Sequence, residues 1–325
     1  MGSFSLDPIS EEYTEIFQSF LHDIDFQIPN HEYHADLQSE MTLHFIEEGF
    51  SEKFICRLRP VLEASAGIAM TTFYHASLEV QKIVGIYTAY AIFIDDQAKE
   101  LEHDLKQFSL NLLSGKPQNN KVLQSYAQFL TGMHDIFGQF GGDMIIKDTI
   151  QFISACYFEL KLDTNNLSFP RDAPDFPNYI RIKTGVAEAY AFMVFPECLF
   201  PEEHYLGTYL PMISYLQAYL NSANDIMSSY KEAFEEEDCN FVDNSAKALG
   251  VTRIQALRKV CADTVELVGR LRCLSSANSG LCATVESFIH GYVMYHLCQR
   301  RYRLEELGLP IANEAQRLVD FSAIQ

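Results

Sequence analysis

Apolar residues recur along most of the chain at intervals of three and four, the period that places them on one face of a helix. The clearest stretches, almost free of proline and glycine, are 13–21, 78–94, 122–137, 146–160 and 212–234. Between them stand residues that end helices, at 115–117, at Gly138 with Gly141 and Gly142, and at 169–174. Strand-type alternation is scarce, and no internal repeat or linker is visible. The pattern predicts an all-α protein whose 325 residues form one domain.

One polar stripe lies within the last of these helical stretches. Asn224, Ser228 and Glu232 are four residues apart, so on a helix their side chains lie along one face over two turns. An amide oxygen, a hydroxyl and a carboxylate are hard ligands of the kind that Mg²⁺ prefers. Lys231 is close enough on the same helix to reach a phosphate held by such a metal. The alternative is a solvated helix face without a metal, because a stripe of this kind also arises by chance.

A second acidic stripe follows the apolar and aromatic stretch 87–94. Asp95 and Asp96 are adjacent carboxylates at the end of a buried helix, where they are costly unless a cation neutralises them. Asp96 and Glu100 are four residues apart, so a helix places them on one face. A helix end that reaches solvent is the alternative for this segment alone. Two oxygen-rich stripes in one chain favour a shared metal cluster that holds a diphosphate.

With these motifs the chain resembles the fungal class I terpene synthases of the trichodiene synthase type. Asn224-Asp-x-x-Ser-x-x-Lys-Glu resembles the family's second metal motif, and Asp95 with Asp96 stands where the family carries its aspartate-rich motif. The segment 176–185 is similar to the one that bears the family's diphosphate-sensing arginine, and Arg301-Tyr302 is similar to its C-terminal Arg-Tyr pair. The resemblance covers roughly residues 65–305, whereas residues 1–60 form a helical segment that matches only loosely.

The resemblance implies a fold, a reaction and a set of site residues. The fold would be a class I terpenoid synthase α-helical bundle around an apolar central cavity. The reaction would be the Mg²⁺-dependent ionisation and cyclisation of farnesyl diphosphate, with three Mg²⁺ ions in the site and release of diphosphate. The implied catalytic residues are Asp95, Arg181, Asn224, Ser228 and Glu232, and the implied metal ligands are Asp95, Asp96, Glu100, Asn224, Ser228 and Glu232. The implied diphosphate-binding residues are Arg181, Lys231, Arg301 and Tyr302. Phe93 lies just before Asp95, and Tyr295 lies about two turns before Tyr302, so both rings are expected to line the cavity. For Gly185 the resemblance implies a helix break that faces the cavity, and the alternative is a glycine tolerated within a helix.

The first metal motif departs from the family's usual Asp-Asp-x-x-Asp/Glu pattern. Its fifth residue is Lys99, which cannot bind a metal while charged, and the nearest acid is Glu100, one residue later. Either Asp95 suffices as the ligand with Lys99 turned away, or Glu100 serves in a motif of longer spacing. The departure puts the exact activity in question while the metal-binding interpretation stands.

These residues are consistent with three hypotheses for the function of the protein. The first is a sesquiterpene cyclase. The second is a repurposed enzyme of the same fold, which joins a prenyl cation to another nucleophile or acts on another substrate, and Lys99 keeps this hypothesis open. The third is a non-catalytic helical binding protein whose acidic stripes are surface. The intact second motif, together with Arg181 and Arg301-Tyr302, argues against the third.

The composition of the chain indicates which binding partners and which cellular location to expect. The formal net charge of −20 argues against nucleic acid and against an anionic membrane surface as partners. The expected partner, a small prenyl diphosphate, is the one that the family resemblance implies. No apolar run reaches the roughly 20 residues of a membrane span, and no signal-peptide pattern opens the chain. The eight cysteines lack a C-x-x-C pair and are expected to be reduced core thiols, which predicts a cytoplasmic location. A solvated connection near the cavity mouth is expected at the acidic run 235–238, and homodimer formation stays open.

Overall fold

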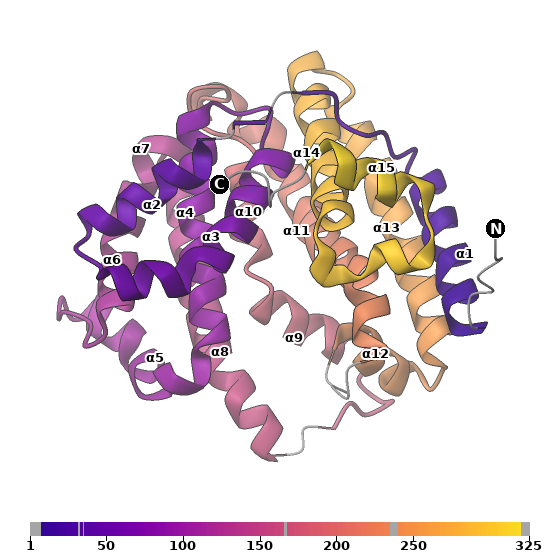
Figure 1. The fold of residues 1–325 in the computed structure, drawn as a ribbon, viewed down its shortest axis with the longest axis horizontal. Coiled ribbons are helices and arrows are strands. Elements are labelled where there is room, and N and C mark those ends of the chain that lie inside the picture. Colours follow the sequence, from indigo (N-terminus) through magenta and orange to yellow (C-terminus); the bar gives the residue numbers. More distant parts are fainter. Residues whose placement is uncertain (1–7, 32, 35, 166–167, 235–239, 320–325) are drawn as a thin grey trace.

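The structure is a computed structural model, and it describes residues 8–319 apart from residues 32, 35, 166–167 and 235–239. These described residues form α-helices and short 3-10 helices and contain no β-strand, so the all-α prediction is confirmed (Figure 1). The helices in chain order are α1 (Pro8–Asp23), α2 (Leu37–Glu47), α3 (Glu52–Thr72), α4 (Leu78–Asp96), α5 (Ala98–Leu113), α6 (Lys121–Phe129), η1 (Leu130–Gly132), α7 (Met133–Phe137), α8 (Gln139–Asn165), α9 (Phe176–Thr184), α10 (Ala187–Met193), α11 (Glu202–Glu232), α12 (Phe241–Leu249), α13 (Arg253–Ser275), α14 (Ser279–Cys298), η2 (Arg300–Tyr302), η3 (Leu304–Leu307) and α15 (Pro310–Leu318). Among them, none is long and apolar enough to cross a membrane.

The hydrophobic pattern locates the long helices better than it locates their ends. The stretch 212–234 lies mostly in α11, which begins already at Glu202 and accommodates Pro211 within the helix. Gly138 separates α7 from α8 with a left-handed φ of 77°, as predicted, but the break predicted at Gly141 and Gly142 is wrong because both lie inside α8. At Gly142 an added Cβ would lie 2.7 Å from the His134 ring, so the small residue serves a close contact with α7.

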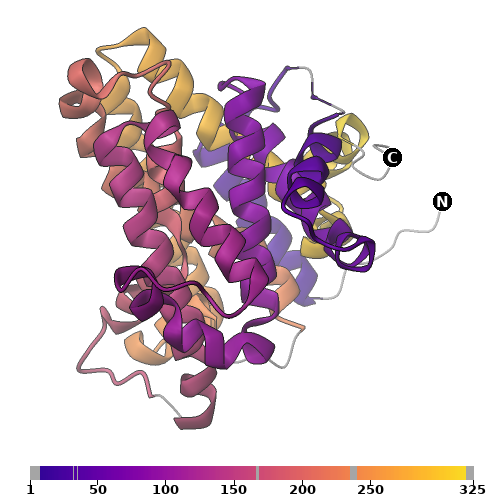
Figure 2. The same cartoon turned by 90° about the vertical axis from the view of Figure 1, so that its left-hand side faces the viewer.

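The helices surround a central space and come from both halves of the chain. In Figure 1 the N-terminal half, including α3 and α4, lies on the left, and α11, α13 and α14 lie on the right. Figure 2 shows the left-hand side, where long helices stand next to one another, and α3 packs on α4 while α5 packs on α8. The first helix is an exception to this division, since α1 packs on α13 in the C-terminal half.

Helices α3 and α14 approach each other closely at Gly291. A Cβ added to this glycine would lie 2.0 Å from the Thr71 carbonyl oxygen and 2.9 Å from the Thr72 Cα. These neighbours are backbone atoms, which cannot rotate away as a side chain can. The absent side chain therefore allows the two helices to meet backbone to backbone beside the central space.

Asp148 is a fully buried carboxylate on α8 that fixes the start of α10. It accepts a hydrogen bond from the Ala189 N–H at 2.9 Å and another from the Gln151 Nε2 at 3.1 Å. Burial raises the pKa of this carboxyl to about 6, although the Ala189 hydrogen bond opposes the shift. The short helix α10 thus begins on a buried acid that titrates above the usual range.

We expect the free energy of unfolding of the wild type to fall, relative to that of Asp148→Asn, as the pH rises from about 4 to about 7. The carboxyl pKa is raised from 3.8 to about 6 in the folded protein, so the folded state binds the proton more tightly than the unfolded state does. The stabilisation that results from this tighter binding is lost as the pH rises from the lower pKa through the higher one. Two pKa units correspond to about 3 kcal/mol. Urea unfolding at both pH values measures the change. Asp143→Asn is the control, because its exposed carboxyl has a pKa lowered by His134 and should change in the opposite direction. A pH-independent difference between the wild type and Asp148→Asn would contradict the assignment.

Candidate active site

The central space contains a cavity of about 230 Å³ whose walls come from α3, α4, α8, α9, α10, α11, α14 and η2. Its apolar and aromatic lining consists of Ile68, Phe73, Ala91, Ile92, Phe152, Val186, Ala187, Tyr190, Leu220, Tyr292 and Tyr295. Its charged and polar lining includes Asp95, Arg181, Asn221, Asn224, Arg301 and Tyr302. Seven residues singled out in the sequence therefore line one cavity, namely Asp95, Arg181, Gly185, Asn224, Tyr295, Arg301 and Tyr302.

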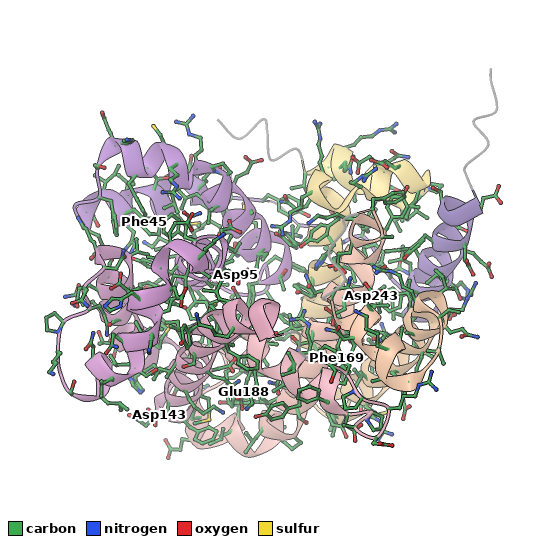
Figure 3. All side chains as sticks on the ribbon, turned by 90° about the horizontal axis from the view of Figure 1, so that it is seen from below. Phe45, Asp95, Asp143, Phe169, Glu188 and Asp243 are labelled. Atoms are coloured by element: carbon green, nitrogen blue, oxygen red, sulfur yellow. The ribbon has the colours of Figure 1, made fainter. Side chains whose placement is uncertain are left out.

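Asp95 and Asp96 are the last two residues of α4, and Asp95 lines this cavity. Figure 3 shows Asp95 near the middle of the molecule, between the helices of the two halves. Both side chains are exposed at the end of the helix, yet the protein around them partly desolvates the carboxylates, and this desolvation raises the pKa of each. The charge of Asp96 raises the pKa of Asp95 further, and the Cys156 thiol lies 3.8 Å from the Asp95 Oδ1. The pair is therefore poised to accept a cation, which would relieve the repulsion.

Arg181 lies in the last turns of α9 and is held by α11. Its Nε donates to both carboxylate oxygens of Asp225, at 2.9 and 3.0 Å. One of its terminal nitrogens donates to the Asn224 Oδ1 at 3.1 Å. The side chains of Arg181 and Asp225 are only 18% and 10% exposed, so this guanidinium is fixed beside the cavity with donors directed at α11.

Gly185 lies four residues after Arg181, at the break between α9 and α10. Helix α9 ends at Thr184, and α10 begins at Ala187 after Val186, which adopts a left-handed φ of 45°. A Cβ at Gly185 would lie 2.1 Å from the Asn221 Oδ1 and 2.8 Å from an Arg181 guanidinium nitrogen. The predicted helix break at Gly185 is confirmed, and its cause is the close passage of this segment over α11.

The stripe predicted on α11 is continuous helix in the structure, so Asn224, Ser228 and Glu232 share one face. The Ser228 hydroxyl is buried and makes no hydrogen bond of ordinary geometry among the described residues. It lies near enough to Glu232 to lower the pKa of that carboxyl, although burial has the larger effect and raises it. Lys231 is partly buried beside Glu232 and also lowers its pKa.

These three oxygens fit a divalent cation. A buried hydroxyl without a hydrogen-bond partner is unfavourable unless another group satisfies it, and a hard cation satisfies hydroxyl, amide and carboxylate oxygens alike. No group of three or more His, Cys, Asp and Glu side chains that could hold a metal occurs in the described part of the chain. The fit therefore depends on the neutral ligands Asn224 and Ser228, with Glu232 on the same face and Asp95 on another wall of the cavity.

Two of the residues proposed from sequence lie elsewhere. Phe93 and Glu100 line a separate hollow, here called the outer hollow, with Phe50, Phe54, Arg57 and Lys121. The Phe93 ring packs on Phe54 at 5.1 Å between centroids, so the expectation that it lines the central cavity is corrected. Phe93 precedes Asp95 by two residues, about 200° around the helix, whereas Ala91 and Ile92 share the face of Asp95.

The placement of Glu100 has a related cause. Helix α4 ends at Asp96, Gln97 leaves the helical conformation, and α5 begins at Ala98. The spacing of four residues between Asp96 and Glu100 therefore does not put them on one helix face. Lys99 is exposed on the first turn of α5. In this structure the acid that lines the central cavity at the first motif is Asp95.

Other parts of the structure qualify the sequence-based expectations. The seven cysteines in the described part of the chain are free, and Cys56, Cys198 and Cys273 are exposed, so the expectation of core thiols is wrong for these three. Cys239 and the acidic run 235–238 lie outside the described residues.

Sequence patterns did not reveal the partners of Arg181 and Asn224, which are Asp225 and His296. His296 is fully buried on α14, and burial lowers its pKa to about 3, so the ring is neutral. A histidine on an apolar helix gives no sign in sequence of the residue it meets. The one signal in the sequence that could have marked His296 as a site residue is its position shortly before Arg301-Tyr302.

Known proteins resemble this chain in sequence and in fold. Residues 10–317 match the family model described as Trichodiene synthase (TRI5). The chain is 36% identical over 309 residues to the (E)-beta farnesene synthase of Metarhizium brunneum (strain ARSEF 3297), covering 95% of this chain and 93% of that protein. It is 27% identical over 241 residues to the alpha-cuprenene synthase COP6 of Coprinopsis cinerea, covering 74% and 72%.

The fold resembles the crystal structure of the linalool/nerolidol synthase from Streptomyces clavuligerus, with a TM-score of 0.63 at 13% identity and coverage of 83% and 99%. This likeness confirms the predicted class I terpenoid synthase fold. Because the family match spans nearly the whole chain, the protein belongs to the trichodiene synthase family and is a terpene synthase.

Proposed function

We propose that the protein is a Mg²⁺-dependent sesquiterpene synthase that ionises farnesyl diphosphate. The observation that carries the proposal is one cavity with two chemistries, an aromatic and aliphatic lining together with Asp95, Arg181, Asn224, Arg301 and Tyr302. An apolar chain and a diphosphate head group need these two environments side by side. The names of the similar proteins support a prenyl substrate.

Mg²⁺ would be held by Asn224, Ser228 and Glu232 on α11 and by Asp95 on α4. The structural support is the buried Ser228 hydroxyl, which makes no hydrogen bond of ordinary geometry among the described residues and lies near Glu232. When bound, the metal neutralises the diphosphate and stabilises the negative charge of the leaving group. Arg181 and Arg301 would add charge-assisted hydrogen bonds to the same group, with Lys231 and the Tyr302 hydroxyl as further donors. These donors gain strength as charge develops on the leaving group.

In the proposed reaction the C–O bond of the substrate breaks, and its electron pair leaves with the diphosphate. The product of this step is an allylic cation within the apolar lining. The rings of Phe152, Tyr292 and Tyr295 can face such a cation, and each ring is worth roughly 0.5–2 kcal/mol. Burial raises the pKa of the Tyr292 and Tyr295 hydroxyls well above their ordinary value, so both tyrosines are neutral and supply no anion to trap the cation.

Two product classes follow from this cation. Attack by a distal double bond on the cation gives a cyclic cation, which becomes a cyclic hydrocarbon by loss of a proton or a cyclic alcohol by capture of water and loss of a proton, as the resemblance implies. Loss of a proton without ring closure gives an acyclic hydrocarbon such as farnesene. The relative at 36% identity is named an (E)-beta farnesene synthase, and this observation favours the acyclic product as the second candidate.

The test is incubation of the purified protein with farnesyl diphosphate and Mg²⁺, with analysis of volatile products and of released diphosphate. We expect C15 hydrocarbon or alcohol products that disappear when EDTA removes the metal. Geranyl and geranylgeranyl diphosphate serve as substrate controls. Turnover only after addition of a nucleophile would favour the repurposed enzyme, and inertness toward every prenyl diphosphate would overturn the proposal.

A further inference from the structure

His296 contacts the proposed metal-binding face of α11 at Asn224, although it is not part of any motif. It is fully buried on α14 among three aromatic rings, with centroid distances of 4.7 Å to Tyr292, 5.1 Å to Tyr295 and 4.6 Å to Tyr302. Its Nε2 lies 3.2 Å from the side-chain nitrogen of Asn224. The ring thus connects the aromatic lining of the cavity to one proposed metal ligand.

The hydrogen-bond partners at both ends of this connection fix the direction of every bond. The His296 Nδ1 lies 2.7 Å from the Tyr292 carbonyl oxygen, which can only accept, so Nδ1 carries the proton. The Nε2 of the neutral ring is then an acceptor, and the Asn224 NH₂ donates to it. At the other end Arg181, which can only donate, lies 3.1 Å from the Asn224 Oδ1. The two ends therefore require the same orientation of the Asn224 amide.

We propose that His296 is a positioning residue that holds the Asn224 amide with its oxygen available to the metal. An amide has one end that binds a cation and one end that repels it, so it needs to be oriented, whereas a carboxylate does not. Without an acceptor at the position of Nε2, the partly buried NH₂ group loses its His296 partner and keeps only the neighbouring Tyr302 hydroxyl, so the orientation of the amide is held less firmly. The inference rests on the proposed function, because it assigns a support to the metal ligand named there.

The test compares two amides of similar polarity at position 296. In His296→Gln the side-chain oxygen can reach the place of Nε2 and accept from Asn224, whereas in His296→Asn it reaches only the place of Nδ1. Binding is followed by the rise in melting temperature with Mg²⁺ and inorganic diphosphate, and the Mg²⁺ dependence of the initial rate is a second readout. We expect His296→Asn to weaken the apparent Mg²⁺ affinity about tenfold or more and His296→Gln to stay near the wild type.

Repeating the comparison in a protein that also carries Asn224→Asp distinguishes a positioning role of His296 from a merely structural one. Asn224→Asp places an oxygen at both ends of the side chain, so orientation no longer matters. In that background His296→Asn should cause no further loss of Mg²⁺ affinity, while its effect on the melting temperature without ligand should persist. If His296→Asn does not fold, His296→Leu replaces it, since it also lacks the acceptor and buries no polar group.

The outcomes are distinct. Unchanged Mg²⁺ dependence in His296→Asn, or an equal loss in both backgrounds, would overturn the positioning role while the proposed function stands. An equal loss of apparent Mg²⁺ affinity in His296→Gln and His296→Asn would also contradict the positioning role. A wild type that gains no thermal stability from Mg²⁺ with diphosphate would overturn the proposed function and this inference together.

Discussion

Glu232→Gln is expected to lower turnover by about a hundredfold or more, because it removes the one carboxylate of the α11 ligand set while keeping its size. Ser228→Ala should also lower turnover severely, but it should leave the melting temperature unchanged or raise it. The Ser228 hydroxyl is buried and makes no hydrogen bond of ordinary geometry among the described residues, and its interaction with Glu232 is weak, so its removal costs the folded state little. Steady-state release of diphosphate and thermal unfolding measure the two effects.

The matched control for Glu232→Gln is Glu203→Gln, the same substitution at an exposed position in the first turn of the same helix. Its turnover should equal that of the wild type. Full activity in both Glu232→Gln and Ser228→Ala would remove α11 from the proposed metal site.

Asp95→Asn is expected to lower turnover nearly as much as Glu232→Gln does, whereas Glu100→Gln should leave turnover close to that of the wild type. Asp95 lines the cavity, and desolvation together with the charge of Asp96 raises its pKa, so a bound cation would stabilise the charged carboxylate. Glu100 lines the outer hollow on α5 and has no place in the cavity wall. Lys99→Ala should change turnover only slightly, since the Lys99 side chain is exposed. Turnover at saturating and at limiting Mg²⁺ distinguishes loss of metal binding from loss of chemistry.

The decisive comparison is between the two carboxylates. A large loss in Glu100→Gln with a small loss in Asp95→Asn would mean that the longer motif spacing is the functional one. It would also mean that the connection at Gln97 rearranges when substrate binds.

Sequence patterns predicted the α11 stripe correctly because the helix runs without interruption from Glu202 to Glu232, so residues four apart stay on one face. The same reasoning failed at the first motif, since Gln97 interrupts the helix and shifts the phase of everything after it. Phe93 was assigned to the cavity because it is near Asp95 in sequence, but the helix turns its side chain to the opposite side.

Contacts between distant segments were beyond the reach of local patterns. Arg181 was found by resemblance, but its carboxylate partner Asp225 is 44 residues away in sequence. The acceptor for the Asn224 amide, His296, is 72 residues away on another helix. Only the packing of α9, α11 and α14 around one cavity brings these groups together.

The backbone contact at Gly291 bears on how this enzyme can evolve new products. Because α14 meets the Thr71 carbonyl without an intervening side chain, the two helices cannot move closer, and any larger residue at Gly291 would force them apart. The cavity residues Thr72 and Tyr292 stand next to this contact. Mutational routes to a differently shaped product therefore pass through exchange of individual lining side chains, and a library built to change selectivity should hold Gly291 constant.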